Sequence, residues 1–157
     1  MKLCVFSDSH GCSEHMIAAV EREAPALCFF LGDGERDLAA VRERFPALPF
    51  FTVRGNCDLR SGASASLVCA LGALRLFAAH GHLLNVKYEP GLDTLCAAAR
   101  EARADAALFG HTHRPLLERR GELLLLNPGS IGRVAQPSYA LLTLDGGAPE
   151  AELKTIK

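Results

Sequence analysis

The sequence contains few aromatic residues and has no excess of charge of either sign. Aromatic side chains make up 6% of its 157 residues, and tryptophan is absent. Lysine and arginine number 17 against 18 aspartate and glutamate, which gives a net charge of −1. Durable nucleic-acid or anionic-membrane binding normally requires a basic surface, and nucleases that bind single strands add aromatic stacking positions. We therefore expect no stable nucleic-acid complex and no membrane association.

Long apolar segments and closely paired cysteines are also missing. No apolar run approaches the ~18 residues that a membrane-spanning helix needs, and the N-terminal apolar run meets Asp8 before a signal peptide could develop. The six cysteines form no C-x-x-C pair, and Cys4, Cys28 and Cys69 lie in apolar, strand-like runs. These three are expected to be buried, reduced thiols. The sequence thus predicts a soluble, cytoplasmic protein.

The first half of the chain has the pattern of alternating strands and helices. Two amphipathic segments, one that follows Ser13 and one over residues 38–45, separate three apolar runs. Continuous apolar runs are typical of central parallel strands that are covered on both faces. The runs are residues 3–6, 27–31 and 49–53. This order predicts a βαβαβ unit with right-handed crossovers.

The second half begins with one more helix and ends in hairpins. Residues 65–79 read as two strands joined at Gly72, residues 90–103 as a helix, and residues 106–109 as a strand. Two antiparallel hairpins are predicted over residues 116–126 and 139–156. With 49% hydrophobic residues, the chain can bury one core as a single domain over residues 1–157. We expect an α/β fold in which two sheets pack face to face with helices outside.

Polar clusters recur at intervals close to the length of one strand and its return helix. Asp33 lies 23 residues after His10, Asn56 lies 23 after Asp33, and His80 lies 24 after Asn56. The clusters are Asp8-Ser9-His10, Gly32-Asp33, Gly55-Asn56-Cys57-Asp58, His80-Gly81-His82 and Gly110-His111-Thr112-His113. Each therefore falls at the same end of successive strands, where open α/β sheets hold their sites. Their Asp, Asn and His side chains are metal-ligand types.

Taken singly, most of these clusters have an ordinary structural explanation. Residues 8–10 could form the turn that caps a helix, and residues 32–34 and 55–56 could form turns that require glycine. His80 could be a half-buried histidine whose polar atoms are hydrogen-bonded. Residues 110–113 fit a turn poorly, since two histidines at i and i+2 after a glycine are good metal ligands. For all five to be structural, they would have to fall at strand ends by coincidence. A metal-dependent hydrolase is the stronger hypothesis.

In this order the motifs resemble the calcineurin-like metallophosphoesterase superfamily, and in particular its small, YfcE-like phosphodiesterase branch. The resemblance spans residues 8–130. It implies a four-layer α/β/β/α sandwich of two mixed sheets with helices outside. It also implies two ligand sets: Asp8, His10 and His113 for one metal, Asn56, His80 and His111 for the other, and Asp33 as the bridge. His82 follows a ligand position and is expected to be a helper at most.

The resemblance further implies a hydrolase with two divalent transition-metal ions. Mixed carboxylate and imidazole ligands suit Mn²⁺, which we expect, as well as Fe, Zn, Co or Ni. Two ions about 3.5–4 Å apart can acidify a bridging water and clamp the phosphoryl group. The family's catalytic positions correspond here to Asp33, Asn56, His80 and Asp58. The charge of two divalent ions, reduced by the negative charges of two carboxylates and a bridging hydroxide, is about +1. This net charge suits a small phosphodiester with one negative charge.

Cys57 departs from much of the superfamily, in which a histidine at this position is thought to protonate the leaving group. A thiol, with an ordinary pKa of ~8.5, is a poor substitute acid. Asp58 fits either the orientation of a metal-bound histidine or a solvent-facing turn. Residues 127–130 are expected to shape the rim of the site, with structural packing as the stronger interpretation. Loops 58–64 and 83–91 are expected to form the substrate pockets.

Two other functions fit the same fold. One is a non-catalytic, metal-binding interaction subunit, because one branch of the fold serves a trafficking complex with an eroded site, although the ligands here are intact. The other is a nuclease, which the charge and aromatic content disfavour. Hydrolysis of monoesters stays open beside diester hydrolysis, as does assembly into a homodimer.

Overall fold

The computed structural model describes residues 1–156, and along them strands and helices alternate much as the apolar pattern predicts. The elements are β1 (Lys2–Phe6), α1 (Glu14–Glu23), β2 (Leu27–Phe30), α2 (Glu35–Arg44), β3 (Phe50–Thr52), β4 (Ser66–Leu71), β5 (Leu74–Ala79), a short 3-10 helix η1 (His82–Leu84), α3 (Asp93–Glu101), β6 (Ala106–Phe109), β7 (Leu116–Arg120), β8 (Leu123–Asn127), β9 (Ser138–Thr143) and β10 (Glu150–Thr155). No helix among residues 1–156 is long and apolar enough to cross a membrane.

The strands form two five-stranded mixed sheets. In the first, with the order β10-β9-β1-β2-β3, the strands β1, β2 and β3 are parallel. β3 forms an edge of this sheet and is only half-buried, so the third apolar run is not a strand covered on both faces as expected. In the second, with the order β4-β5-β6-β8-β7, the strands β5, β6 and β8 are parallel. The two predicted late hairpins are confirmed, and they join different sheets: β7 and β8 complete the second sheet, whereas β9 and β10 extend the first.

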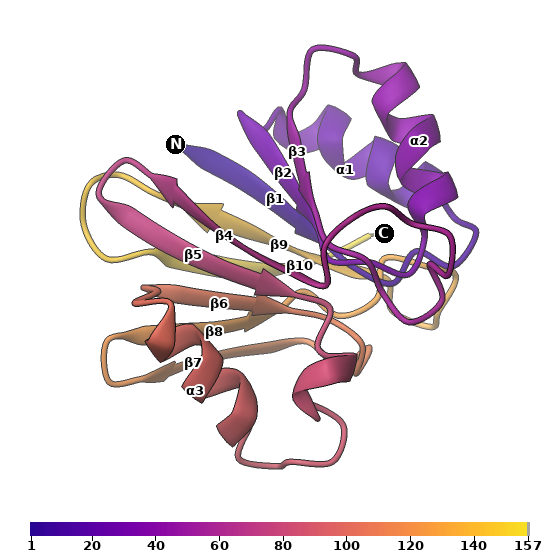
Figure 1. Ribbon diagram of the computed structural model, residues 1–157. Coiled ribbons are helices and arrows are strands. Elements are labelled where there is room, and N and C mark those ends of the chain that lie inside the picture. Colours follow the sequence, from indigo (N-terminus) through magenta and orange to yellow (C-terminus); the bar gives the residue numbers. More distant parts are fainter. Residues whose placement is uncertain (157) are drawn as a thin grey trace.

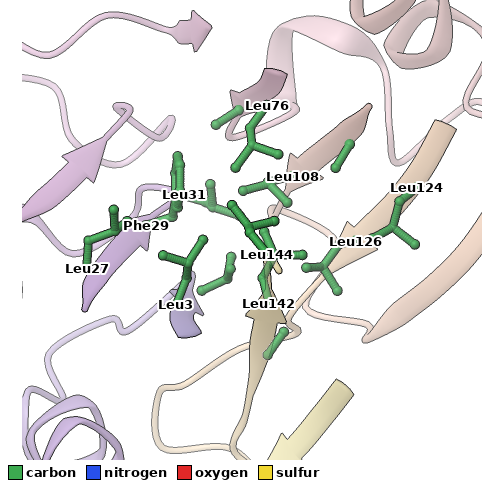
Figure 2. Close-up of a cluster of buried hydrophobic side chains, with 14 of the residues drawn as sticks. Leu3, Leu27, Phe29, Leu31, Leu76, Leu108, Leu124, Leu126, Leu142 and Leu144 are labelled. Atoms are coloured by element: carbon green, nitrogen blue, oxygen red, sulfur yellow. The ribbon is translucent and has the colours of Figure 1, made fainter. Parts of the chain in front are cut away.

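Three apolar clusters fill the spaces between four layers. Leu3 and Phe29 of the first sheet face Leu108 and Leu126 of the second in the central cluster (Figure 2). A second cluster packs the first sheet against α1 and α2, and a third packs the other sheet against α3. Figure 1 shows the helices on the two outer sides of the paired sheets. The predicted α/β/β/α sandwich is therefore confirmed.

The third helix is shorter than the predicted range of residues 90–103. It begins only at Asp93, because Leu92 has a left-handed backbone with φ of 52°. The carboxylate of Glu89 then accepts hydrogen bonds from the amide and hydroxyl of Thr94 at 2.8 and 2.7 Å. Pro90 lies in the preceding loop and not in a first helical turn.

The cysteines follow the expected pattern with one exception. All six are free thiols, and Cys4 and Cys28 are fully buried, as predicted. Cys69 is only half-buried, because β4 forms an edge of its sheet, although this side chain packs against the central cluster. Cys57 is exposed and lies in the loop after β3.

Candidate metal centre

The seven predicted ligands meet at one edge of the sandwich, although five different loops supply them. Each loop follows the carboxyl end of a parallel strand. Asp8 and His10 follow β1, Asp33 follows β2, Asn56 follows β3, His80 follows β5, and His111 and His113 follow β6. Because both sheets direct these ends to the same edge, residues separated by more than a hundred positions come into contact: the His10 and His113 Nε2 atoms are 3.3 Å apart.

The first group of side chains consists of Asp8, His10 and His113. Oδ1 of Asp8 lies 3.1 Å from Nε2 of His113 and 3.7 Å from Nε2 of His10. Its other oxygen, Oδ2, accepts hydrogen bonds from the Ser7 hydroxyl at 2.6 Å and the His111 amide at 3.0 Å. Oδ1 is buried and has no hydrogen-bond partner among residues 1–156. A buried carboxylate oxygen without a donor is costly, and a cation at this point would satisfy it.

The second group consists of Asn56, His80 and His111. The buried His80 donates a hydrogen bond from Nδ1 to the Leu31 carbonyl at 2.7 Å, which leaves the lone pair on Nε2. That nitrogen faces Oδ1 of Asn56 at 3.1 Å and Nδ1 of His111 at 3.2 Å. Two acceptor atoms, Asn56 Oδ1 and His80 Nε2, thus point at each other. This donor set fits a bound divalent cation.

Asp33 lies between the two groups. Its Oδ1 accepts a hydrogen bond from the Cys57 amide at 2.8 Å. Its Oδ2 lies 3.9 Å from Nε2 of His10 in the first group and 3.4 Å from Nε2 of His80 in the second. One carboxylate therefore faces both groups, which is the geometry that a ligand shared by two ions requires.

The two carboxylates and His111 have protonation states that suit metal binding. Burial tends to raise the pKa of Asp8, but the contacts with His10 and His113 outweigh it, and this pKa lies well below its usual range. Burial also opposes the ionised form of Asp33. The contact with His80 outweighs burial and lowers the pKa of Asp33 to about 2. Burial and the charge of His80 lower the pKa of His111 to about 4. At neutral pH the two carboxylates are charged and His111 is neutral, as metal ligands must be.

The pKa of His10, in contrast, is raised by the contact with Asp8. Burial tends to lower the pKa of His80, but contacts with Asp33 and Asp8 outweigh burial and raise this pKa. Metal binding therefore competes with protonation at these two rings.

Backbone strain is concentrated at the predicted ligands. Among residues 1–156, nine residues other than glycine have positive φ, and five of them are Asp8, His10, Asp33, His111 and His113, with φ between 43° and 66°. Such conformations cost about 1–3 kcal/mol each and persist where the surrounding structure enforces them for function. This concentration is independent support for a functional site at the strand ends.

Gly110 allows the loop with two histidines to approach Asp8. A Cβ atom at this position would lie 1.9 Å from the Ser7 hydroxyl oxygen and 2.9 Å from Oδ2 of Asp8. No side chain fits there, so the glycine in the Gly110-His111-Thr112-His113 motif is required by close packing. An alanine at position 110 would collide with Ser7 and Asp8 and force the loop with the two histidines away from the site.

Several residues that the sequence analysis did not single out hold the ligand loops in position. Besides Ser7, Asp37 accepts hydrogen bonds from the Ser9 hydroxyl at 2.5 Å and the Gly11 amide at 2.8 Å, and so fixes the loop of His10. Asp37 lies in the first turn of α2, which begins two residues after Asp33. The only sequence signal was this short spacing from a predicted ligand.

Residues 127–130 hold the ligand loops in place, in agreement with the packing role expected for this segment. Ser130 donates a hydrogen bond from its hydroxyl to the Asp8 carbonyl at 2.7 Å. Asn127 donates from its amide to the Gly110 carbonyl and to the Thr112 hydroxyl, both at 3.0 Å. This segment therefore connects the loops that carry Asp8 and His111 and acts through packing and hydrogen bonds.

Asp58 has a different role from either of the two that its position suggested. Its carboxylate accepts hydrogen bonds from four backbone amides, at distances between 2.7 and 3.1 Å. The donors are the amides of Asp33, Gly34, Glu35 and Gly55. No hydrogen bond joins Asp58 to a histidine within residues 1–156. Asp58 thus ties the Asn56 loop to the Asp33 loop and to the start of α2.

Replacing Asp58 with asparagine should lower the free energy of unfolding of the metal-free protein by about 1–3 kcal/mol at neutral pH, because hydrogen bonds to a charged acceptor are lost. Burial opposes the ionised form, but the amides of Gly55 and Glu35 outweigh it and lower the pKa of Asp58. A lowered folded-state pKa stabilises the fold above the ordinary value of ~3.9, and this stabilisation disappears as pH falls through the lowered pKa.

Urea denaturation at several pH values tests this. The difference between wild type and Asp58→Asn should be largest at neutral pH and shrink below about pH 4. Asp145→Asn is a matched control in an exposed turn. Equal stability of Asp58→Asn and wild type at neutral pH would contradict the role that we assign to this carboxylate.

Two further side chains, Cys57 and His82, border the centre. Cys57 lies beside it: its Sγ, a nitrogen of His10 and a carboxylate oxygen of Asp33 are all within 4.8 Å of one another. Burial and the contact with Asp33 raise the pKa of the Cys57 thiol. The ring of His82 lies 5.4 Å from that of His80, and its Nδ1 is buried without a partner among the described residues. Both residues border the centre, which agrees with the expectation that His82 is at most a helper.

The chain matches the family model of the calcineurin-like phosphoesterase superfamily domain over residues 1–147. It is 34% identical over 153 residues to the probable metallophosphoesterase YsnB of Bacillus subtilis, which covers 94% of this chain and 87% of YsnB. A predicted phosphoesterase from Streptococcus pneumoniae has a similar crystal structure, with a TM-score of 0.82, 30% identity and coverage of 98% of this chain and 88% of that one.

The phosphoesterase YfcE of Escherichia coli is a third relative. Its structure has a TM-score of 0.67 and 30% identity, and covers 92% of this chain and 90% of YfcE. These similarities agree with the order of the motifs and with their convergence in the fold. The chain belongs to the calcineurin-like phosphoesterase superfamily.

Proposed function

We propose that the protein is a dinuclear metal-dependent phosphodiesterase that hydrolyses a small phosphodiester. The observation that supports this most directly is the pair of ligand groups joined by one carboxylate. Asp8, His10 and His113 would hold one ion, and Asn56, His80 and His111 the other. Asp33, whose Oδ2 lies within 3.9 Å of a histidine nitrogen in each group, would be shared.

When bound, two divalent ions supply an activated water and positive charge for the phosphoryl oxygens. The residues of the chain determine where this happens. His80 is held in one tautomer by the Leu31 carbonyl, and Asp8 is held by Ser7 and the His111 amide. Ligands that are fixed in this way need little reorganisation when metal and substrate bind. No protein nucleophile is then required.

The charge of the centre favours a diester over a monoester. Asp8 and Asp33 both carry negative charge at neutral pH, which partly neutralises two divalent ions. The remaining positive charge suits a substrate with one negative charge near the metals. A cavity of about 440 Å³ borders the centre through His10, Asp33 and Cys57. Its lining adds three carboxylates, Glu35, Asp37 and Asp58, and two arginines, Arg36 and Arg60, so it holds no surplus of cations for a second negative charge.

The metal is proposed to be Mn²⁺, with Fe, Zn, Co and Ni as alternatives, since all accept mixed carboxylate and imidazole ligands. A test begins with chelator-treated protein and adds back each metal. We expect no hydrolysis without metal, and hydrolysis of bis(4-nitrophenyl) phosphate faster than of 4-nitrophenyl phosphate after reconstitution. Preference for the monoester would contradict the charge argument. Absence of any hydrolysis with metal bound would favour a non-catalytic binding role.

A further inference from the structure

A second and larger cavity, of about 770 Å³, opens beside the metal centre. Its walls come from the loop before α3, from the end of β6 and from the segment that leads into β7. Thr112, which lies between the ligands His111 and His113, is one of the lining residues. Lys87 also lines it, and its charge adds to the stronger effects of burial and His80 in lowering the pKa of His111. The cavity is therefore adjacent to the metal centre.

An exposed aromatic ring lies at this cavity. Tyr88 is 84% exposed, whereas the chain's other tyrosine, Tyr139, is fully buried. Pro90 and the buried Phe109 add apolar wall surface. An aromatic ring that is free of packing contacts offers its face for stacking against another ring system. In a chain with so few aromatic residues, this placement beside the centre indicates a binding role.

The charged groups at this cavity are predominantly positive. Lys87 and Arg114 line it, and neither forms an ion pair within the described part of the chain. Glu89 is the one acidic residue among the lining residues. Both of its oxygens are engaged by Thr94, as described above for the start of α3. The cavity thus offers two cations without an ion-pair partner among the described residues, whereas carboxylates outnumber arginines in the lining of the smaller cavity.

We propose that this cavity is a substrate subsite that receives one ester group of the phosphodiester, an aromatic or heterocyclic group that carries a second negative charge. The ring would stack on Tyr88, and the second anionic group would lie between Lys87 and Arg114. The proposal rests on the proposed function and specifies its substrate class. A methyl or other small ester group would leave the subsite empty.

The test uses substrates that share 4-nitrophenolate as the leaving group, so that the chemistry stays constant. They are methyl 4-nitrophenyl phosphate, thymidine 5′-(4-nitrophenyl phosphate), its 3′-phosphorylated derivative, and 4-carboxybenzyl 4-nitrophenyl phosphate. In wild type, kcat/KM should rise by about tenfold or more on adding a ring, and again on adding the second charge. The last substrate distinguishes a nucleoside from another charged aromatic group.

Each subsite residue should affect one part of this preference. Tyr88→Ala should remove the gain from the ring, and Lys87→Ala and Arg114→Ala should remove the gain from the second charge. Each variant is compared with its own rate on the methyl diester, so that any change at the metal centre that is common to all substrates cancels. Arg100→Ala, in the exposed last turn of α3, is the matched control for loss of a cation.

The outcomes separate this proposal from the proposed function. Equal kcat/KM for all four substrates in wild type and variants would overturn the subsite and leave the phosphodiesterase intact. If no substrate is hydrolysed, the phosphodiesterase proposal fails, and binding of thymidine 3′,5′-bisphosphate to the Mn²⁺-loaded protein decides on the subsite. Calorimetry should then show about tenfold weaker binding for Lys87→Ala than for Arg100→Ala; equal affinities would overturn the subsite.

Discussion

Alanine at Asp8 or at His113 should reduce phosphodiesterase activity to below a tenth of the wild-type rate, while the protein stays folded. Both side chains belong to the same ligand group, and Oδ1 of Asp8 lies 3.1 Å from Nε2 of His113. Even residues that only support metal ligands typically cost about 10–100-fold when they are removed, so loss of a ligand should cost at least as much. Both residues lie in loops after strands and outside the three apolar clusters.

The measurement is the rate on bis(4-nitrophenyl) phosphate with saturating Mn²⁺, together with circular dichroism to verify folding. Asp145→Ala is the matched control, because Asp145 lies in the exposed turn between β9 and β10, at the end of the sheet away from the site. It should retain the wild-type rate. A folded Asp8→Ala or His113→Ala protein that keeps more than about a tenth of the rate would show that the ligand assignment is wrong.

Replacing Cys57 with histidine should increase turnover by up to ~10²–10⁴-fold, the usual contribution of a positioned general acid. An imidazole titrates near neutral pH, whereas burial and Asp33 raise the pKa of the native thiol further from neutrality. The position is suitable, since Sγ lies within 4.8 Å of ligand atoms of His10 and Asp33. The surrounding residues pack around a thiol, so we expect the gain at the lower end of this range.

Leaving groups of different basicity identify the cause of any gain. The increase should be largest for a diester with a poor leaving group, where protonation matters most, and smallest for one with a good leaving group. Cys57→Ala removes the thiol without adding an acid and should show no such difference. Equal effects on both substrates, with unchanged metal content, would show that this position does not govern leaving-group protonation.

The fold, and the meeting of the polar motifs at one edge of it, could be predicted because their signals are local. Runs such as residues 3–6 and 27–31 are apolar at every position, which parallel strands covered on both faces require. The ligands follow these strands directly, so the order of strands brings them to one edge. The start of α3 was predicted incorrectly because it depends on the left-handed conformation of Leu92, which propensity does not reveal.

Support of the site depends on contacts between loops, and these are not visible in the sequence. Asp58 follows Asn56 closely, yet its four partners include three amides around Asp33, on a different loop. Ser130 reaches the carbonyl of Asp8 across 122 positions. Loops 58–64 and 83–91 were expected to form pockets, and residues of both line cavities beside the centre. The charge of each cavity emerges only when the loops are placed in space.

The most direct test of the central hypothesis is to count and locate the metal ions in the reconstituted protein. Metal analysis should give two equivalents of Mn²⁺ per chain. Anomalous diffraction should find one ion at Asp8, His10 and His113, another at Asn56, His80 and His111, and Asp33 in contact with both. One equivalent or fewer, with no ion bound by both Asn56 and Asp33, would contradict the dinuclear centre.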